Sequence, residues 1–397
     1  MTTKEQKKLL LENMTSLLEL PESAYQKAKD RYEDIGKWFD RDESLCKDNN
    51  PHIFPQGSFR LGTVIRPLDE SEAYDLDLAC NLRKGITKKT HTQESLKVLV
   101  GREIESYRVA RRIKASKEAK HRCWRLEYQD DHNFHMDIVP SIPADDSRQK
   151  LIFESLRKSG ADDSFAESTS HMTISITDDR HPEYKQLSEN WHISNPEGYA
   201  NWFKSRMNLS LRSIMEQAQV DEIPIYQRKT PLQRSIQLLK RHRDMMFKDD
   251  SDVKPISIII TTLATRAYQG ESDIELAISS ILSRMGNLVN SSRPRVPNPV
   301  DPAEDFADRW SRPECNHLNL EQNFWNWLKQ AQNDFELLGA SDDANFISEQ
   351  AGQKFSVCMD ASELRKCLGL AMASSITIIT PKEHTISQPA KPWRKGK

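Results

Sequence analysis

Two short segments of the chain alternate strictly between apolar and polar residues, and this pattern constrains the fold more than any other feature. They are residues 74–80 (YDLDLAC) and 134–138 (FHMDI). Successive side chains of a strand point to opposite faces of the sheet, so each segment is predicted to be a strand that buries one face. Asp75 and Asp77 would then project together from the first strand, and Asp137 from the second.

The paired acids of the first predicted strand need a chemical explanation. Two carboxylates so close together repel each other unless one is protonated or a cation binds them. Hard divalent ions such as Mg²⁺ prefer oxygen ligands, usually one or two carboxylates together with substrate phosphates. The simpler alternative is that Asp75 and Asp77 lie on a solvated strand face and that Asp137 pairs with a neighbouring arginine. If the two strands are neighbours, the three acids would instead form the ligand set of a two-metal centre.

A glycine-containing turn precedes the acids. Gln56, Gly57 and Ser58 are predicted to open a short helix that Gly62 and Thr63 close. Glycine lets the backbone approach a phosphate closely, and amides at a helix start beside a hydroxyl favour an anion. A Gly-Ser pair is more often an ordinary turn. The whole segment is therefore either a decorated hairpin or a phosphate cradle followed by a metal site.

Most of the remaining pattern is helical. Apolar residues three and four apart predict a helix over residues 22–40, and a basic helical stretch is expected over residues 93–122. Because proline is common at the first helical position, helices are expected to begin at Pro231 and Pro255. The other predicted segments are helices over residues 274–288 and 320–338 and a proline-rich surface loop over residues 291–302.

This layout predicts an α/β front half and a helical back half. The expected units are an N-terminal lobe with a leading helix over residues 1–210, a helical lobe over 211–380 and a mobile tail over 381–397. Six scattered cysteines without a C-x-x-C pair indicate a cytoplasmic protein with free thiols. A net charge of -2 gives no global attraction to nucleic acid or an anionic membrane. No apolar run reaches the roughly eighteen residues of a membrane span.

The order of these motifs resembles that of the DNA polymerase β-like nucleotidyltransferases. With the back half included, the chain resembles the CD-NTases, bacterial relatives of cyclic GMP-AMP synthase and oligoadenylate synthase. The stretches that carry this resemblance span residues 55 to about 330: PQGSFRLGT, YDLDLACNL, HMDIVPSIP, WHISNPEGYANWF, LQRSIQLLKRHRD, KPISIIITTLATRAY and NPVDPAEDFADRW. The resemblance implies an α+β fold, with a bilobed polymerase β-like core of mixed sheet and helices and a helical C-terminal lobe.

The resemblance also implies roles for the three acids. Asp75 and Asp77 would be ligands of two Mg²⁺ ions, with Mn²⁺ as an alternative metal. Asp137 would hold the catalytic ion and help to deprotonate the attacking ribose hydroxyl. These three side chains are therefore the expected catalytic and metal-binding residues.

Five further residues match places where the family holds the donor nucleotide. Gly57 and Ser58 would bind the triphosphate, with Gln56 beside them. Lys240, on a helix of the C-terminal lobe, and Ser257, at the start of the next helix, would complete the grip. A helical wheel is consistent with this role, because it places Lys240 at the edge of an apolar arc, where it can border a cleft. The common alternative for such a lysine is a solvated surface position.

The function implied by the resemblance is template-independent nucleotidyl transfer. The enzyme would join and cyclise NTPs, ATP and/or GTP, into a cyclic di- or trinucleotide, releasing pyrophosphate, and the product would be a second messenger of anti-phage signalling. One alternative is a poly(A)-type, tRNA-end or small-molecule nucleotidyltransferase on the same core. Another is a catalytically dead sensor that only binds nucleotide.

The expected partners follow from the same resemblance. A regulatory protein encoded in the same operon would bind the C-terminal tail, whereas conjugation of that tail is not favoured, because Lys397 follows Gly396. The zinc-binding insertion of the animal DNA sensor has no counterpart, so a nucleic-acid activator is not indicated. The basic run over residues 108–125 could bind RNA or a phosphate tail, but such a run is more typical of a solvated helix face. Three aromatic residues are candidates either for base stacking or for a core: Trp191, Tyr199 and Trp202.

Overall fold

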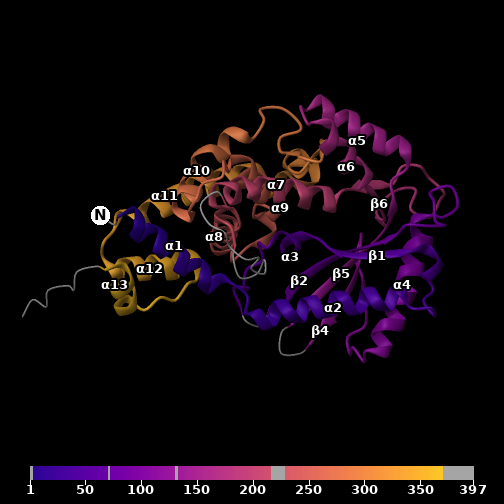
Figure 1. Ribbon diagram of the computed structural model, residues 1–397, viewed down its shortest axis with the longest axis horizontal. Coiled ribbons are helices and arrows are strands. Elements are labelled where there is room, and N and C mark those ends of the chain that lie inside the picture. Colours follow the sequence, from indigo (N-terminus) through magenta and orange to yellow (C-terminus); the bar gives the residue numbers. More distant parts are fainter. Residues whose placement is uncertain (1–2, 70–71, 130–132, 216–228, 370–397) are drawn as a thin grey trace, which may run out of the picture.

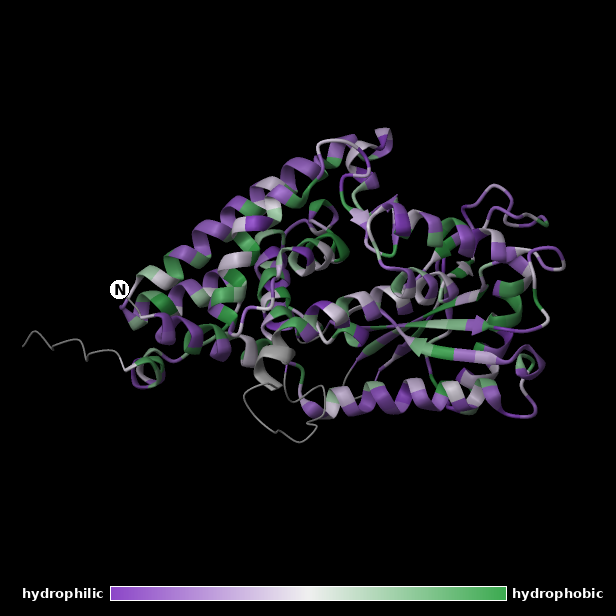
Figure 2. Cartoon of the chain, turned by 45° about the horizontal axis from the view of Figure 1, so that its top comes forward, coloured by the Kyte–Doolittle hydropathy of each residue, from purple (hydrophilic) through white to green (hydrophobic). Residues whose placement is uncertain are grey.

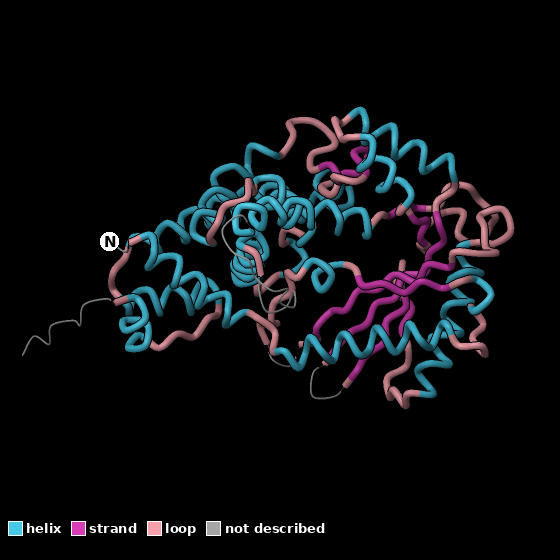
Figure 3. Tube along the Cα trace, in the orientation of Figure 1, coloured by secondary structure: helices cyan, strands magenta, loops and turns pink. Residues whose placement is uncertain are grey.

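The chain folds into an α+β lobe and a helical lobe that lie side by side. The structure is a computed structural model that describes residues 3–69, 72–129, 133–215 and 229–369. Figure 1 shows the sheet with its flanking helices at one end and a bundle of helices at the other. Figure 3 shows the same separation of strands from helices. The expected bilobed α+β architecture is confirmed.

The sheet of the first lobe is mixed. Its path is β1-β2-β5-β4-β3, and β6 and β7 extend it from β5. The strands are β1 Pro51–Pro55, β2 Tyr74–Leu82, β3 Glu118–Ala119, β4 Trp124–Tyr128, β5 Phe134–Pro143, β6 Ile174–Ile176 and β7 His192–Ser194. Strands β2 and β5 are parallel and adjacent, whereas the other pairs are antiparallel. The two predicted alternating strands are thus confirmed, and they are neighbours.

Helices cover the apolar face of this sheet. The buried side chains of β2 and β5 share one core with helices α2 (Glu22–Asp40) and α4 (Gln93–Ala110). In Figure 2 the strands are largely hydrophobic, and the outer helices carry many hydrophilic residues. The predicted helix over residues 22–40 is confirmed as α2. The remaining helices of this lobe are α3 Gly57–Leu61, α5 Asp146–Lys158 and α6 Asp163–His171.

The basic helix expected over residues 93–122 is shorter than predicted. Helix α4 ends at Ala110, and Arg112 adopts a left-handed φ of 54°. The amide of Ile113 then donates to the carbonyl of Arg108, and the Ile113 side chain packs into the sheet core. A left-handed residue followed by an apolar contact is a common way to end a helix. Because that contact is tertiary, local helix propensity did not reveal it.

The second lobe is almost entirely helical. Its helices are α7 Pro196–Met215, α8 Pro231–Met246, α9 Ser257–Ala267, α10 Ile274–Arg284, α11 Leu320–Ala340, α12 Ala344–Phe355 and α13 Ala361–Leu368. Helix α1 (Lys4–Leu18) packs among them through Leu10, Leu11 and Met14, although it begins the chain. The short elements of this lobe are the 3-10 helices Ser251–Val253, Met285–Leu288, Asp308–Ser311 and Pro313–Leu318 and the ribbon of β8 Pro297–Asn298 with β9 Asp301–Asp305. A further 3-10 helix, Lys47–Asn49, precedes β1 in the sheet lobe.

Several predicted starts and loops can now be placed. Pro231 is the first residue of α8, behind a capping box made by Thr230. Helix α9 begins two residues after Pro255, because the residue between them is extended. The predicted loop over residues 291–302 includes β8 and the start of β9. The candidate stacking residues all contribute to cores: Trp191 to the sheet core, and Tyr199 and Trp202 to the helical one.

The lobe boundary proposed near residue 210 falls inside α7, and the tail over residues 381–397 lies outside the described residues. Within the described ranges, no helix combines the length and the apolar character that crossing a bilayer requires.

Candidate active site

The three predicted acids lie on one face of the sheet. In the parallel register of β2 and β5, Asp77 is opposite Asp137 and Asp75 is opposite His135. Residues two apart on a strand share a face, so Asp75 joins the other two. The side chain of Asp75 is 63% exposed, whereas that of Asp137 is 16% exposed. The cluster therefore runs from the solvent into the body of the protein.

Asp77 bears most of the electrostatic strain of this cluster. Burial, followed by the negative charges of Asp75 and Asp137, raises the pKa of Asp77 to about 7. Arg125 and Lys240 oppose this rise, but they do not cancel it. A carboxyl whose pKa is raised in this way gains from a nearby positive charge. The site therefore favours a bound cation.

Arg125 is the arginine that pairs with Asp137, a pairing that the sequence analysis gave as the simpler alternative without naming the residue. Arg125 lies opposite Asp137 on β4, and its Nε and Nη2 atoms each donate to one oxygen of that carboxylate at 2.7 Å. The same Nη2 lies 3.6 Å from Asp75 Oδ1. His135 Nδ1 lies 3.5 Å from that same Asp75 oxygen. The alternation of residues 124–128 (WRLEY) was the available signal, because it places Arg125 on one face of a strand.

Gly57 is pressed against Asp77. Strand β1 runs antiparallel to β2, and the amide of Gln56 donates to the Asp77 carbonyl at 2.8 Å. Gly57 has a φ of +62°, and a Cβ at this position would lie 2.4 Å from Asp77 Oδ2. Only glycine suits both the left-handed backbone and this close approach. The predicted phosphate turn and the predicted acids are therefore in direct contact.

A pocket of about 540 Å³ opens beside these residues. Ser58, the loop that follows α3, and Asp75 line one side, while α8 and the start of α9 line the other. Its basic lining residues are Arg66, Lys240, Arg243, Lys248, Lys254 and Arg309. Glu72, Asp75, Asp244 and Asp252 also line the pocket, and the remaining excess of positive charge suits a polyanion. The pocket thus brings Ser58, Lys240 and Ser257 together.

Lys240 is buried rather than solvated. Its Nζ donates to the carbonyl of Thr63 at 2.9 Å, and burial, with a contribution from Arg243, lowers the pKa of Lys240 to about 8. Arg243 is a pocket residue that the sequence analysis missed. Its Nη1 donates to Ser257 Oγ at 2.9 Å and to the Pro255 carbonyl at 3.0 Å. Its position one helical turn after Lys240 was the signal that could have identified it.

A second hollow, of about 730 Å³, adjoins the first. Arg125, Glu127, Asn133 and His135 contribute to its lining. The two hollows share Asp75, together with Glu72 and Ala73. The exposed end of the acidic cluster therefore lies where two cavities meet.

Comparison with known proteins identifies the family. Residues 51–140 match the model described as "Cyclic GMP-AMP synthase DncV-like, nucleotidyltransferase domain". A c-di-GMP synthase of Roseivirga ehrenbergii is 31% identical over 334 residues, which cover 81% of this chain and 79% of that protein. The chain belongs to the CD-NTase family. As a CD-NTase, it is a nucleotidyltransferase, which confirms the expected enzyme class.

Solved structures of other CD-NTases share the fold. CdnG of Bradyrhizobium diazoefficiens in complex with GTP superimposes with a TM-score of 0.63 at 18% identity, over 92% of this chain and 100% of that one. The CdnC:HORMA-deltaN complex of E. coli MS115-1 gives a TM-score of 0.55 at 10% identity, over 86% of this chain and 94% of that one. The similarity therefore extends over both lobes.

Nucleotidyltransferases of this kind generally use divalent metals, so the acids of this CD-NTase can be tested for their fit to such an ion. Asp75, Asp77 and Asp137 supply the oxygen ligands that Mg²⁺ prefers, and the raised pKa of Asp77 indicates a deficit of positive charge. The donor set therefore fits. In the described parts of the chain, however, no three acidic, histidine or cysteine side chains lie close enough to share an ion. Both oxygens of Asp137 are instead bound by Arg125.

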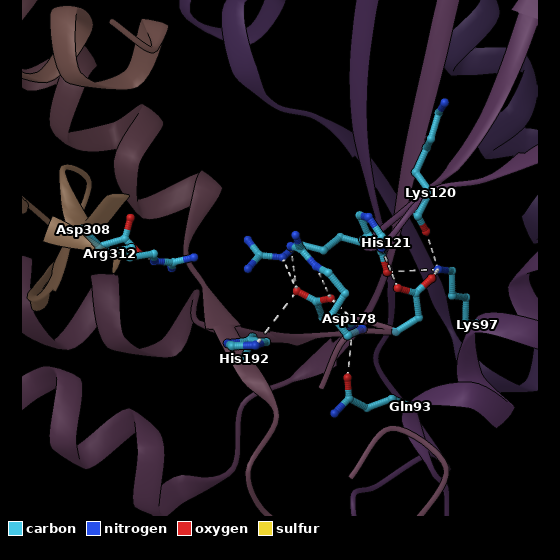
Figure 4. Close-up of polar contacts among 11 residues, drawn as sticks. Gln93, Lys97, Lys120, His121, Asp178, His192, Asp308 and Arg312 are labelled. Carbon is cyan, nitrogen blue, oxygen red and sulfur yellow. Dashed lines mark hydrogen bonds and ion pairs between the residues drawn. The ribbon is translucent and has the colours of Figure 1, made fainter. Parts of the chain in front are cut away.

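A second polar network in this CD-NTase has a structural role (Figure 4). Asp178 is almost fully buried and accepts from Arg122 Nε at 2.8 Å, while its amide donates to Gln93 at 2.8 Å. Lys97 and His121 bind the neighbouring Asp179. These contacts attach the segment after β6 to α4 and to the loop before β4. Figure 4 also draws Asp308 and Arg312 of the helical lobe, which form an ion pair with each other apart from this network.

Proposed function

We propose that this CD-NTase joins two NTPs and closes them into a cyclic dinucleotide. The observation that carries the proposal is the direct contact between Gly57 and Asp77, beside a pocket that is lined by basic residues. It combines a close backbone approach, an acidic cluster and a polyanion site in one place. The relative named c-di-GMP synthase and the GTP complex of CdnG support GTP as the substrate and c-di-GMP as the product.

The basic pocket would hold the donor nucleotide. Ser58, Lys240, Arg243 and Ser257 would bind the triphosphate, with Gln56 and Gly57 closing the turn beside the α-phosphate. Because a bound polyanion stabilises the ammonium form of Lys240, its pKa would rise from about 8 when the nucleotide enters. Four contacts from two lobes would fix the α-phosphorus for in-line attack, which lowers the entropic part of the barrier.

The acidic cluster would carry the chemistry. Asp75, Asp77 and Asp137 would hold two Mg²⁺ ions, or Mn²⁺ ions in their place. These ions, when bound, would lower the pKa of the attacking hydroxyl and neutralise charge on the leaving pyrophosphate. Asp137 would turn away from Arg125 and accept the proton of the ribose hydroxyl. The ribose oxygen would then form a bond to the α-phosphorus of the donor as the bond between that phosphorus and pyrophosphate breaks.

The second hollow would hold the acceptor nucleotide. It meets the donor pocket at Asp75, so a hydroxyl from one hollow can reach a phosphorus atom in the other. After the first transfer, the linear intermediate would turn and present its remaining triphosphate to the same acids. A second transfer, with a second pyrophosphate released, would close the ring.

The biological role is proposed from the family alone. The product would be a cytoplasmic second messenger of anti-phage signalling. The HORMA complex of a CD-NTase with the same fold supports regulation by a partner protein. The C-terminal tail proposed to bind such a partner lies outside the described residues.

One assay tests the activity. Purified protein is incubated with Mg²⁺ or Mn²⁺ and all four NTPs, and the products are resolved by mass spectrometry. We expect phosphatase-resistant cyclic dinucleotides, which disappear in the Asp75→Ala/Asp77→Ala variant. The matched control is Asp42→Ala/Glu43→Ala, which removes two exposed acids from the turn after α2. Ladders that need added RNA, transfer to a small acceptor, or bound nucleotide without pyrophosphate release would each contradict the proposal.

A further inference from the structure

One face of helix α8 is attached to the last residue of α3 and to the loop that follows it by a row of side-chain hydrogen bonds. The row consists of Gln233, Gln237, Lys240 and Arg241, which lie within an arc of about 100° on the helix. All four are buried, with at most 7% of any residue exposed. Their acceptors are backbone carbonyls: Gln233 to Leu61 at 2.9 Å, Gln237 to Val64 at 2.7 Å, Lys240 to Thr63 at 2.9 Å, and Arg241 to Arg66. We call this row the α8 ladder.

Several carbonyls of the loop accept hydrogen bonds from the ladder, whereas the amide of Arg66 donates to the Leu18 carbonyl. Residues 62–68 form neither helix nor strand, so their carbonyls have no regular backbone partners. Buried carbonyls must be paired by other donors, and the ladder supplies them. Gly62 shows how closely the two surfaces meet, since a Cβ there would lie 2.4 Å from Gln233 Nε2.

The same loop forms a wall of the candidate triphosphate pocket. It follows Ser58 and precedes Asp75, and residues 64–68 line the pocket opposite α8. Lys240 belongs to both the ladder and the pocket lining. The ladder therefore determines how far the phosphate turn lies from the basic residues of α8.

We propose that Gln237 is a positioning residue that holds the triphosphate pocket open at its working width before nucleotide binds. The inference rests on the proposed nucleotide-binding function of that pocket. Gln237 is one of the two middle residues of the ladder, and its Nε2 also donates to Glu19 Oε2 at 3.1 Å. Glu19 in turn accepts from Lys229 and from Tyr25, so the ladder is joined to the segment between α1 and α2.

Gln237→Met is the most direct test. Methionine has a similar shape but cannot donate, so a buried carbonyl loses its partner while packing is kept. Gln233 is less suitable, because its side chain also completes the capping box of α8. Ser235→Ala is the matched control, since Ser235 is equally buried but lies about 200° from Gln233 on the helix. Ile347→Val in α12 controls for a general loss of stability.

Three measurements are made on the full chain. Hydrogen exchange of residues 57–68 is followed without nucleotide, GTP affinity is measured with Mg²⁺, and thermal unfolding is recorded. In Gln237→Met we expect roughly tenfold faster exchange in this segment and roughly tenfold weaker GTP binding, the effect of one buried hydrogen bond. We also expect KM for GTP to rise more than kcat falls, because the lost contact would stabilise bound substrate and transition state equally. Both control variants should keep wild-type exchange here and wild-type GTP affinity.

The outcomes separate the two proposals. Unchanged exchange in Gln237→Met, or a loss of GTP affinity that Ile347→Val reproduces at equal thermal stability, would overturn the positioning role. Faster exchange in a protein whose wild type binds no GTP would support the ladder and contradict the nucleotide-binding function instead. If Gln237→Met does not fold, Arg241→Met removes the last rung and is measured in the same way.

Discussion

At Asp77, burial and the like charges of Asp75 and Asp137 both disfavour the ionised carboxylate. Its pKa, raised to about 7, means that the folded protein binds a proton there which the unfolded chain releases near pH 4. A carboxyl of this kind makes the free energy of unfolding fall as the pH rises from about 4 through 7. Above pH 7 the folded state contains an ionised Asp77 that is crowded by other acids, and its stability is lowest there.

Asp77→Asn should remove this pH dependence. Without divalent cations, we expect the variant to be more stable than the wild type by about 2 to 4 kcal/mol at pH 8 and to show no gain near pH 4. Urea unfolding at both pH values measures the difference. Asp42→Asn, an exposed carboxylate, is the control and should show neither effect. A constant offset between Asp77→Asn and the wild type at the two pH values would contradict the assignment.

The contact between Gly57 and Asp77 gives a second prediction. Gly57→Ala should abolish pyrophosphate release, because the new methyl group would displace the Asp77 carboxylate. Gly160→Ala is the matched control, since Gly160 also has a positive φ but no atom lies within 4 Å of its Cβ position. Both variants should lose about 1 kcal/mol from backbone strain. Retained activity in Gly57→Ala would show that the acids tolerate the displacement.

At the scale of single elements, the contact of α4 with the sheet is unusually close. A Cβ on Gly101 would lie 2.6 Å from ring carbons of Trp124, whose Nε1 donates to the Lys97 carbonyl at 2.8 Å. Gly101→Ala should therefore destabilise the protein by about 1 to 3 kcal/mol through overpacking. Gly352→Ala in α12 has open space around it and should instead stabilise by about 0.5 to 1 kcal/mol. Equal denaturation midpoints for the two variants would contradict this packing argument.

The sequence predicted elements best where local pattern and tertiary structure agree. Strand alternation located β2 and β5, and proline located the start of α8, because these signals are short-range. The end of α4 depended on the contact of Ile113 with the sheet, which no local pattern contains. Arg125 was not named for a similar reason, since its role arises from the pairing of β4 with β5.

At the scale of the whole molecule, the first helix of the chain packs in the C-terminal helical lobe. Helix α1 packs in the same core as helices more than 200 residues later, through Met14 and its neighbours. This docking was not predicted, because the amphipathic pattern of a helix shows that it has a buried face but not which partner covers that face. Strand alternation alone placed Asp75 and Asp77 on one face. That Asp137 faces them depends on the pairing of β2 with β5, and the roles of the three acids were expected from the family resemblance.

Met14→Ala tests that docking. We expect a loss of about 2 to 5 kcal/mol, with faster amide exchange in α8 and α10 than in the sheet. Ile35→Ala in α2 creates a comparable cavity in the sheet core and should give the opposite pattern. Uniform acceleration across both lobes in either variant would mean that the lobes open as one cooperative unit.

The buried ammonium of Lys240 also gives the enzyme a built-in labelling position. With a pKa of about 8, about half of the Lys240 side chains are neutral amines at pH 8, whereas an ordinary lysine is almost fully protonated there. In the nucleotide-free protein, formaldehyde with a borohydride reductant should therefore methylate Lys240 ahead of the exposed lysines, and bound GTP, which favours the ammonium form, should protect it. Peptide mapping would then identify the nucleotide pocket by covalent chemistry, without any need for turnover.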